Sequence, residues 1–266
     1  MAYDTNLGRF RAVVAAALAH LEARRQEVND LNVFPVADGD TGDNMALTLL
    51  AVLSELDRLV EEQKDRTLDE IGRDEIVDAV ARAALLGARG NSGVILSQFI
   101  RGAAEELASR PGELVDPTLI GSAMTRSVDR AYDSVRNPAE GTILTVAREM
   151  AHRIVTELAH MEVPRLDATA PDEQLQNELI AQVLESALEA GQESVRRTPE
   201  LLPVLADSGV VDAGGYALTV IFAGVVAALR GSDAPEIEHH SAPARVTHPE
   251  HSSETYRYCT NFAVTC

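Results

Sequence analysis

Residues 31–45 read LNVFPVADGDTGDNM, a run in which oxygen-bearing side chains and glycines lead directly into a helical pattern. Asp38 and Asp40 lie two positions apart across Gly39, so in an extended or turning backbone both carboxylates lean toward the same side. Each carboxylate would raise the pKa of the other unless a cation lay close to both. The spacing therefore predicts a site for a hard divalent cation such as Mg²⁺, which would bring the phosphates of a nucleotide with it.

The segment after this run has the periodicity of a helix. Gly42 allows a sharp turn, and the apolar residues that follow have helical spacing: Met45, Leu49, Val52, Leu53, Leu56 and Leu59. A phosphate at the turn would face free backbone N–H groups of the helix start. The alternative is an Asx-rich turn that only caps an ordinary helix, since the same residue types favour turns and caps.

The composition limits the classes of partner. The 266 residues include 42 acidic and 23 basic side chains, which gives a formal charge of −19. This charge argues against nucleic acid and against an anionic membrane as partners. It also repels ATP. This repulsion is screened beyond roughly 8 Å at physiological salt, so a cation bound at a site can still attract the phosphates of a nucleotide.

The cysteines and the apolar segments indicate a cytoplasmic protein without an integral membrane segment. Cys259 and Cys266 both lie near the C-terminal end, so no disulfide framework organises the chain. The N-terminal apolar stretch lacks the layout of a signal peptide. Residues 217–229 are apolar but number only 13, against about 20 for a spanning helix, and are predicted to form a buried core helix.

Helical patterns dominate up to residue 230, and no alternating β pattern of convincing length interrupts them, which predicts an all-α bundle. The expected helices cover residues 7–21, 43–62, 71–86 after a capping box at 67–70, 94–108, a segment from Asp116-Pro117, 142–158, 172–195, a short turn from Thr198-Pro199, and 215–229. Residues 29–43, 87–93, 136–142 and 207–215 form connections rich in Gly, Asp, Asn and Ser. In an up-and-down bundle, alternate loops share an end and can converge on one ligand.

Three of these connections support a phosphate or nucleotide site. Residues 86–94, LGARGNSGV, place three glycines around Asn91 and Ser92 just before a helix, although the spacing is not that of a Walker A motif. Residues 207–216, DSGVVDAGGY, combine three glycines with two aspartates and permit close approach of a ligand to the backbone. Thr142 in EGTIL (140–144) is the weakest of these signals and is equally explained as an N-cap.

The combined set resembles the nucleotide-binding domain of dihydroxyacetone kinase L subunits, and is most similar to the kinase subunit of bacterial fatty acid kinase. The resemblance rests on residues 32–45, 87–98, 140–146 and 209–215, which occur in matching order, and covers residues 5–230. It implies an eight-helix antiparallel barrel whose loops at one end bind ATP or ADP with two Mg²⁺ ions.

The resemblance also implies roles for individual residues. Asp38 and Asp40 match the metal-binding and catalytic aspartates, and Asn32 stands near the place of a third aspartate, with Asp30 as a substitute. Asp43 stands where threonine is common. The implied nucleotide-binding positions are Thr41, Gly42, Asn44 and Met45, then Asn91, Ser92 and Gly93, and, bordering the nucleoside, Thr142, Ile143, Asp212 and Gly214. Arg89 is the expected transition-state stabiliser, with a salt bridge at a helix end as the alternative.

The expected activity is phosphorylation of the carboxylate of a fatty acid that a separate fatty-acid-binding protein holds, with an acyl phosphate as product. A carboxylate acceptor is already ionised at pH 7 and needs no general base. His20 and His152 are accordingly expected to be surface or capping residues. The alternatives are a dihydroxyacetone kinase subunit that binds ADP or ATP, and a nucleotide-binding regulatory module without turnover.

The expected organisation is a kinase domain at 1–230, a flexible polar linker at 231–254 and the first strand of a following domain at 255–266. That domain, which resembles the middle domain of fatty acid kinase, is expected to be incomplete in this sequence. Cys259 is either a zinc ligand of it or an unpaired cysteine. A homodimer is a further possibility.

Overall fold

The computed structural model describes residues 6–65, 72–162, 165–166 and 172–242, which form ten helices and no strand. In chain order the helices are α1 (Asn6–Ala23), α2 (Arg25–Asp30), α3 (Thr41–Asp65), α4 (Arg73–Gly87), α5 (Gly90–Ser109), α6 (Pro117–Asp133), α7 (Ile143–Leu158), α8 (Glu173–Leu201), α9 (Pro203–Ser208) and α10 (Ala213–Arg230). Only α2 and α9 are short, with six residues each. The predicted all-α bundle is confirmed.

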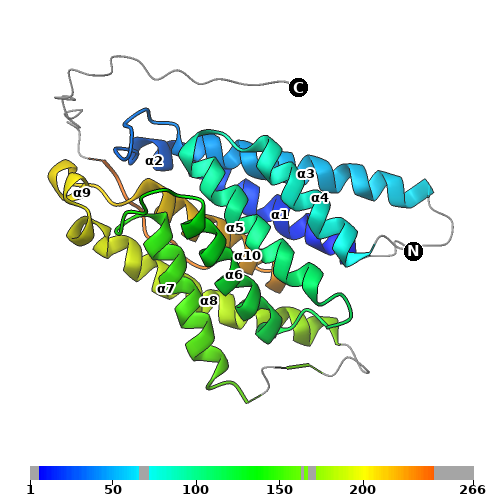
Figure 1. The fold of residues 1–266 in the computed structure, drawn as a ribbon. Helices are drawn as coiled ribbons and strands as arrows, with labels where there is room; N and C mark the ends of the chain where they lie inside the picture. The colour runs from blue at the N-terminus through cyan, green and yellow to red at the C-terminus, as the bar shows by residue number, and fades with distance from the viewer. Residues whose placement is uncertain (1–5, 66–71, 163–164, 167–171, 243–266) are drawn as a thin grey trace.

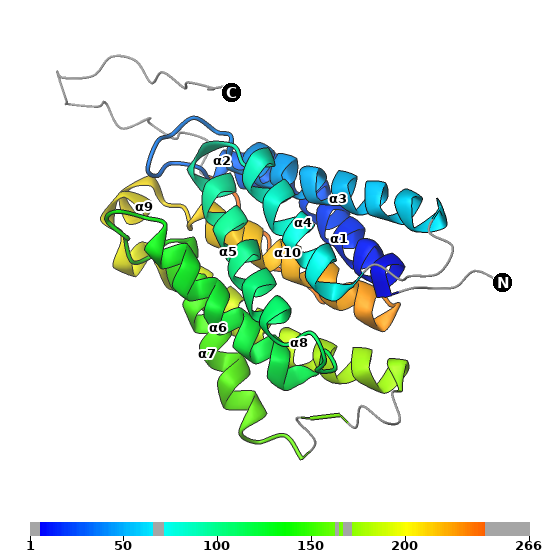
Figure 2. The same ribbon diagram turned by 45° about the vertical axis from the view of Figure 1, so that its right-hand side comes forward.

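The long helices lie side by side, with α10 in the middle of the bundle (Figures 1 and 2). The short helix α2 and the segment after it, the turn between α4 and α5, the connection from α6 to α7, and α9 all lie at the same end, on the left in Figure 1. The polar connections predicted from the sequence are therefore gathered at one end of the bundle.

Helix α10 is the core of this arrangement. It packs against α1, α2, α3, α7 and α8, and residues on every side of it are buried, including Tyr216, Val220 and Val226. Its 18 residues have a mean hydropathy of 1.6, enough by composition for a membrane span, but 78% of this window is buried inside the bundle. A helix that is apolar on all sides is expected at the centre of a bundle, so the prediction of a buried core helix is confirmed.

Polar caps fix several helix starts, and the one at Asp116 was predicted. The Asp116 side chain accepts from the Leu119 N–H at 2.8 Å at the start of α6, with Pro117 in the first turn. Asp172 accepts from the Leu175 N–H at 3.0 Å at the start of α8. The capping box proposed at 67–70 lies outside the described residues.

One helix was not predicted, and one local prediction was wrong. Residues 25–30 form α2, which carries no clear sequence signal because six residues are too few to show a helical period. The Thr198-Pro199 pair does not start a new turn, since α8 continues through Pro199 to Leu201. Proline has no N–H to donate to the Val195 carbonyl, but the Thr198 hydroxyl donates to that carbonyl at 2.7 Å, so the helix tolerates the proline.

Residues 231–242 lie along the bundle, whereas their polar composition favoured a flexible linker. Ile237 is buried in the main hydrophobic cluster, and Ala234 and Ala242 pack against that cluster. Ile237 is the one large apolar side chain of a polar segment, which is a weak sequence signal, and its burial depends on a surface that only the folded bundle provides. Residues 243–254, the strand proposed at 255–266 and Cys259 lie outside the described residues.

Candidate functional site

The connection between α2 and α3 is organised by Asn29. Its side-chain oxygen accepts from the backbone N–H of Gly42 at 2.7 Å and from that of Asp43 at 3.3 Å, and its amide nitrogen donates to the Asp43 carboxylate at 3.2 Å. Gly42 lies so close to α2 that a Cβ atom there would be 2.5 Å from the Arg25 carbonyl oxygen. Glycine is therefore required at position 42, and α2 holds the first turn of α3.

Asp38 and Asp40 lie together just before α3, as the sequence predicted. The Asn32 amide nitrogen donates to the Asp38 carboxylate at 2.8 Å. Burial raises the pKa of the Asp40 carboxyl, a side-chain hydrogen bond with Asn44 lowers it, and the hydrogen bond and charge of Asp38 raise it further. Without a cation the pair is thus a site of electrostatic repulsion, which a divalent ion would relieve.

The donors at this position suit Mg²⁺. Two carboxylates and the nearby amide of Asn32 are hard oxygen-bearing groups, and Mg²⁺ commonly takes one or two carboxylates with the rest of its shell from water and phosphate. Among the described residues no three His, Cys, Asp or Glu side chains gather into a metal-binding group. An ion at Asp38 and Asp40 would therefore need oxygen ligands from an amide, water or a phosphate.

The two alternatives for a third metal ligand have different surroundings. Asn32 is buried and contacts Asp38, whereas Asp30 is exposed and accepts a hydrogen bond from Gln26 at 2.7 Å. The geometry favours Asn32 as the residue that completes the Asp38 environment. Asp43 forms an ion pair with Arg25 at 3.3 Å, so its carboxylate joins α3 to α2.

The turn between α4 and α5 lies directly against the start of α3. Gly90 has φ +57°, and a Cβ atom there would overlap the side-chain nitrogen of Asn44. Gly93 is buried beside Thr48 and the Asn44 carbonyl. The structure therefore brings the first two predicted phosphate loops together through Asn44.

The remaining predicted residues of these two loops differ in exposure. Thr41, Asn44 and Met45 are buried in the first turns of α3, whereas Asn91 is exposed and Ser92 is half-buried at the start of α5. The N-termini of α3 and α5 thus lie next to each other. The Gly42, Asp43 and Asn44 N–H groups of α3 already donate to the Asn29 side chain and the Asp40 carbonyl, so an anion would meet mainly the N–H groups at the start of α5, which has no side-chain cap from Arg89.

Arg89 lies at the edge of this region. Its Nη1 atom donates to the carbonyl of Ala88 at 2.8 Å and to that of Leu86 at 3.3 Å, at the C-terminus of α4, and the side chain is exposed. Arg89 thus lies at a helix end as the alternative role required, but its partners are carbonyl oxygens and not the acidic side chain that a salt bridge needs. A transition-state role would require the side chain to leave these carbonyls.

A second group of predicted residues forms where α7 and α10 begin. Asp212 is the N-cap of α10, where it accepts from the Gly215 N–H at 2.7 Å, and the backbone of Ile143 at the start of α7 also donates to it. Gly214 lies against Ile143, where a Cβ atom would be 3.2 Å from the Ile143 Cβ. Thr142 caps α7. The residues proposed to border the nucleoside therefore form one contiguous group.

Burial dominates the electrostatics of Asp212. It raises the pKa of this carboxyl to about 6, against the lowering effect of the backbone hydrogen bonds from Gly215, Ile143 and Gly214. The Thr198 hydroxyl also accepts from the Asp212 N–H at 3.0 Å, which ties this loop to α8. A carboxylate with this pKa is mostly ionised at neutral pH, where it stabilises both helix starts.

Comparison with known sequences identifies the family. The family model described as the DAK2 domain matches residues 35–227, which is more than half of the chain and includes both groups of loops. The chain belongs to the DAK2 domain family. The matched segment of this DAK2 domain begins at Pro35, three positions before Asp38, and ends in α10.

Its relatives among curated proteins are longer than this DAK2 chain. Protein YloV of Bacillus subtilis is 35% identical over 96% of this chain, which corresponds to 43% of that protein. The uncharacterized protein SSP1546 of Staphylococcus saprophyticus is 34% identical over 96% of this chain, which corresponds to 43% of that protein. The chain thus spans less than half the length of these relatives.

Solved structures agree on the fold. The native dihydroxyacetone kinase of C. freundii matches with a TM-score of 0.50 and 18% identity, over 81% of this chain and 33% of that chain. The same enzyme in complex with AMP-PNP and Mg²⁺ matches with a TM-score of 0.51 and 19% identity, over the same shares. At this identity the comparison establishes a shared fold.

Sequence reasoning missed the residues that hold the DAK2 loops in place. Asn29 belongs to no motif, and Thr198 carries only the signal of a helix start with Pro199, yet their side chains bind the backbone at Gly42 and Asp212. Their contacts span 13 and 14 positions along the chain. The only available signal for Asn29 was its place in a polar segment before the aspartates.

Proposed function

We propose that this DAK2 domain is an ATP- and Mg²⁺-dependent kinase domain that phosphorylates the carboxylate of a fatty acid held by a separate fatty-acid-binding protein. The product is an acyl phosphate. The observation that carries the proposal is the Asp38–Asp40 pair placed between Asn32 and the adjoining N-termini of α3 and α5.

The arrangement supports phosphoryl transfer. The catalytic work in such reactions is mainly the positioning of the phosphates and the neutralisation of their charge, and bound Mg²⁺ supplies much of that neutralisation. In this chain Asp38 and Asp40 would hold two Mg²⁺ ions, with Asn32 orienting Asp38. The N–H groups at the start of α5, which lies beside the start of α3, would bind phosphate oxygens.

The reaction is a simple displacement at phosphorus. A carboxylate oxygen of the fatty acid forms a bond to the γ-phosphorus of ATP, the bond from that phosphorus to the bridging oxygen breaks, and ADP leaves. No proton has to be removed from the acceptor, since a carboxylic acid is ionised at pH 7. This agrees with the absence of histidine from residues 29–43, 87–93, 136–142 and 207–215.

The choice of substrate rests on the sequence of residues 255–266, which resembles the opening of the middle domain of fatty acid kinase, an extension that stand-alone dihydroxyacetone kinase L subunits lack. Phosphorylation of dihydroxyacetone is the second candidate, because the fold matches a dihydroxyacetone kinase whose structure contains AMP-PNP and Mg²⁺. That acceptor is a neutral hydroxyl and would need a base, which the partner carrying it would supply. In both cases a cytoplasmic setting suits a nucleotide-dependent enzyme.

The test is transfer of labelled phosphate from γ-labelled ATP with Mg²⁺. The chain, and a full-length relative such as YloV, would each be mixed with a fatty-acid-binding protein loaded with palmitate or with a dihydroxyacetone-loaded partner. We expect a labelled product with the lipid-loaded protein that hydroxylamine destroys, because hydroxylamine cleaves acyl phosphates. Label on dihydroxyacetone alone would establish the second candidate.

Equilibrium titration with AMP-PNP and Mg²⁺ separates an enzyme from a regulatory module. Tight binding without transfer to either acceptor, in the full-length relative as well, would identify a nucleotide-binding regulatory domain. No binding of nucleotide would refute all three forms of the proposal.

A further inference from the structure

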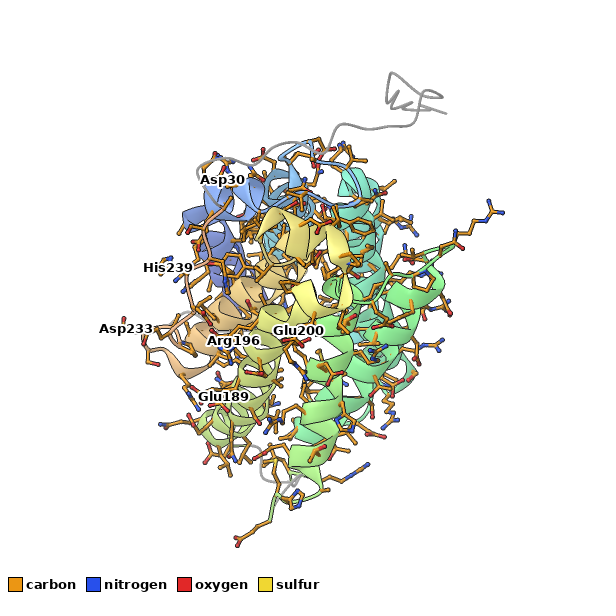
Figure 3. All side chains as sticks on the ribbon, turned by 90° about the vertical axis from the view of Figure 1, so that its left-hand side faces the viewer. Asp30, Glu189, Arg196, Glu200, Asp233 and His239 are labelled. Atoms are coloured by element: carbon orange, nitrogen blue, oxygen red, sulfur yellow. The ribbon has the colours of Figure 1, made fainter. Side chains whose placement is uncertain are left out.

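Residues 232–242, here called the C-terminal strap, follow α10 and run in an extended course across the bundle. Ile237 in the middle of the strap is only 5% exposed and belongs to the main hydrophobic cluster. Asp233 and His239 of the strap and Arg196 of α8 lie on the same side of the molecule in the end-on view of Figure 3. The strap is therefore a docked segment with one buried anchor.

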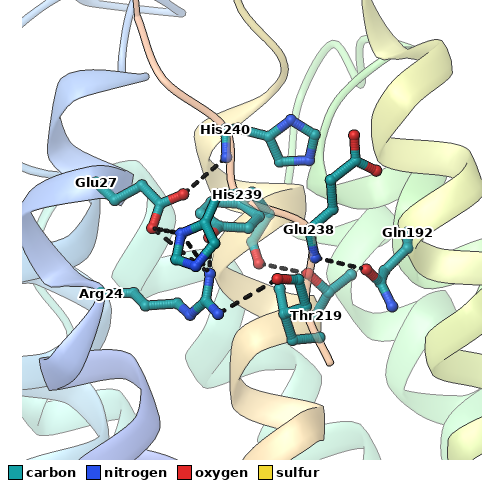
Figure 4. Close-up of polar contacts among 9 residues, drawn as sticks. Arg24, Glu27, Gln192, Thr219, Glu238, His239 and His240 are labelled. Carbon is teal, nitrogen blue, oxygen red and sulfur yellow. Dashed lines mark hydrogen bonds and ion pairs between the residues drawn. The ribbon is translucent and has the colours of Figure 1, made fainter. Parts of the chain in front are cut away.

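Gln192 of α8 binds the strap backbone on one side. Its Nε2 atom donates to the Glu236 carbonyl at 3.3 Å, and its Oε1 atom accepts from the Glu238 N–H at 3.0 Å (Figure 4). A single amide thus satisfies the backbone groups on both sides of Ile237, as a neighbouring β-strand would. Arg196 adds an ion pair with Glu238 at 2.9 Å.

Arg24 and Glu27 bind the strap on the other side. Arg24 donates from Nη2 to the Ile237 carbonyl at 3.3 Å and from Nη1 to the Tyr216 hydroxyl of α10 at 2.8 Å. Glu27 accepts from the His240 N–H at 2.7 Å (Figure 4). Arg24 is the N-cap residue of α2 and Glu27 lies within α2, so the strap is attached to this short helix at two points.

Other residues of α2 hold the segment from Leu31 to Asp43, here called the aspartate loop, which contains Asp38 and Asp40. Asn29 of α2 binds the Gly42 and Asp43 N–H groups, and Arg25 pairs with Asp43 at 3.3 Å. A six-residue helix is too short to hold its position by itself, so its place depends on these contacts. Helix α2 therefore lies between the strap and the start of α3, with side-chain contacts to both.

We propose that the strap sets the position of α2 and, through Asn29, the affinity of the aspartate loop for nucleotide and Mg²⁺. This inference rests on the proposed function, because it assigns a regulation to the same nucleotide site. Coupling of this kind is reciprocal: docking of the strap strengthens nucleotide binding, and bound nucleotide strengthens docking of the strap by the same factor. Arg24 and Glu27 are positioning residues in this scheme.

The first experiment uses Gln192→Ala in the whole chain. Gln192 contacts the strap backbone from α8 and lies outside both α2 and the loop, so its removal loosens the strap without altering the site. We expect faster hydrogen exchange at Glu238 and His240 and a roughly threefold to tenfold higher Kd for AMP-PNP with Mg²⁺. Gln182→Ala, an exposed position of the same helix, is the matched control and should leave both quantities unchanged.

The second experiment measures the reverse effect on the unaltered chain. Saturating AMP-PNP with Mg²⁺ should slow exchange of the Glu238 and His240 amides, whereas Mg²⁺ alone should have a smaller effect. The proposal is overturned if Gln192→Ala loosens the strap and leaves the Kd unchanged, or if nucleotide binding leaves strap exchange unchanged. In either case nucleotide binding by the unaltered chain would preserve the proposed function, while no binding at all would refute both.

Discussion

The side-chain oxygen of Asn29 accepts a hydrogen bond from the backbone N–H of Gly42 at 2.7 Å, across 13 positions of the chain. It is a cap supplied to α3 from another helix rather than from the residue preceding it. The first N–H groups of a helix have no partner within the helix, so this bond satisfies one of them and fixes where α3 begins. Asp38 and Asp40 lie just before this start, so the position of the α3 N-terminus also sets the position of their carboxylates.

Asn29→Ala should therefore lower both stability and nucleotide affinity. Loss of a helix cap costs about 1–2 kcal/mol of unfolding free energy, and the aspartate loop loses its anchor as well. Urea denaturation and nucleotide titration would measure the two effects. Gln26→Ala, at an exposed position of the same helix, should stay within about 0.5 kcal/mol of the unaltered chain.

Asp40→Asn should separate metal binding from folding. Because burial and the Asp38 charge disfavour the ionised form of Asp40, the neutral side chain should leave the Tm without Mg²⁺ unchanged or higher. The rise in Tm on addition of Mg²⁺ and AMP-PNP should be lost, with affinity reduced by roughly tenfold or more. A full Mg²⁺-dependent rise in the variant would remove Asp40 from the metal site.

The third metal ligand can be tested by a pair of variants. Asn32→Ala removes the group that contacts Asp38 and should weaken Mg²⁺-dependent nucleotide binding, whereas Asp30→Asn should have little effect because Asp30 is exposed and paired with Gln26. Isothermal titration of both variants checks the assignment. The opposite order of effects would place Asp30 at the metal.

Gly90→Ala should disrupt the junction of the two phosphate loops. The positive φ disfavours alanine, and its Cβ would displace the Asn44 side chain, so we expect a loss of about 1–3 kcal/mol in unfolding free energy and weaker nucleotide binding. Gly112→Ala is the control, since a Cβ at that position meets no atom within 4 Å. Equal stability of the two variants would contradict the close packing of Gly90 on Asn44.

Asp212 should give the protein a specific dependence of stability on pH. Its pKa in the folded state, about 6, is above the ordinary value of 3.8, so its contribution to stability is full below pH 3.8 and is lost as pH rises through 6. Asp212→Asn keeps an N-cap but does not titrate. The stability of the variant relative to the unaltered chain should therefore rise by about 2–3 kcal/mol between acid and neutral pH.

Urea denaturation at a series of pH values would follow this difference. Parallel stability curves for the two proteins would show that the Asp212 carboxyl is not perturbed by burial.

Arg89→Ala tests the transition-state role. If the side chain leaves the α4 carbonyls during transfer, kcat should fall by roughly tenfold or more with little change in nucleotide Kd. Arg82→Ala, at an exposed position of α4, is the control and should change neither quantity. A normal kcat for Arg89→Ala would leave Arg89 only the helix-end interaction seen in the structure.

Much of the molecule could be read from local patterns. The apolar period after Asn44 predicted α3, the Asp116-Pro117 pair predicted the start of α6, and the glycine-rich turns predicted where loops would meet. These features depend on residues within one or two helical turns of each other. Helix α2 and the path of α8 through Pro199 were not predicted, because a short helix has no period and the Thr198 compensation is a side-chain geometry.

The sequence by itself determined the all-helical class, the positions of the polar loops and the chemistry of the Asp38–Asp40 pair. Only the tertiary structure decided that Asn29 caps α3, that Asn44 joins two loops, and that the strap is fixed to α2 and α8. Helical periods and caps are local properties of the chain. Contacts between residues 13 to 213 positions apart exist only after the helices have packed, because no single segment contains both partners.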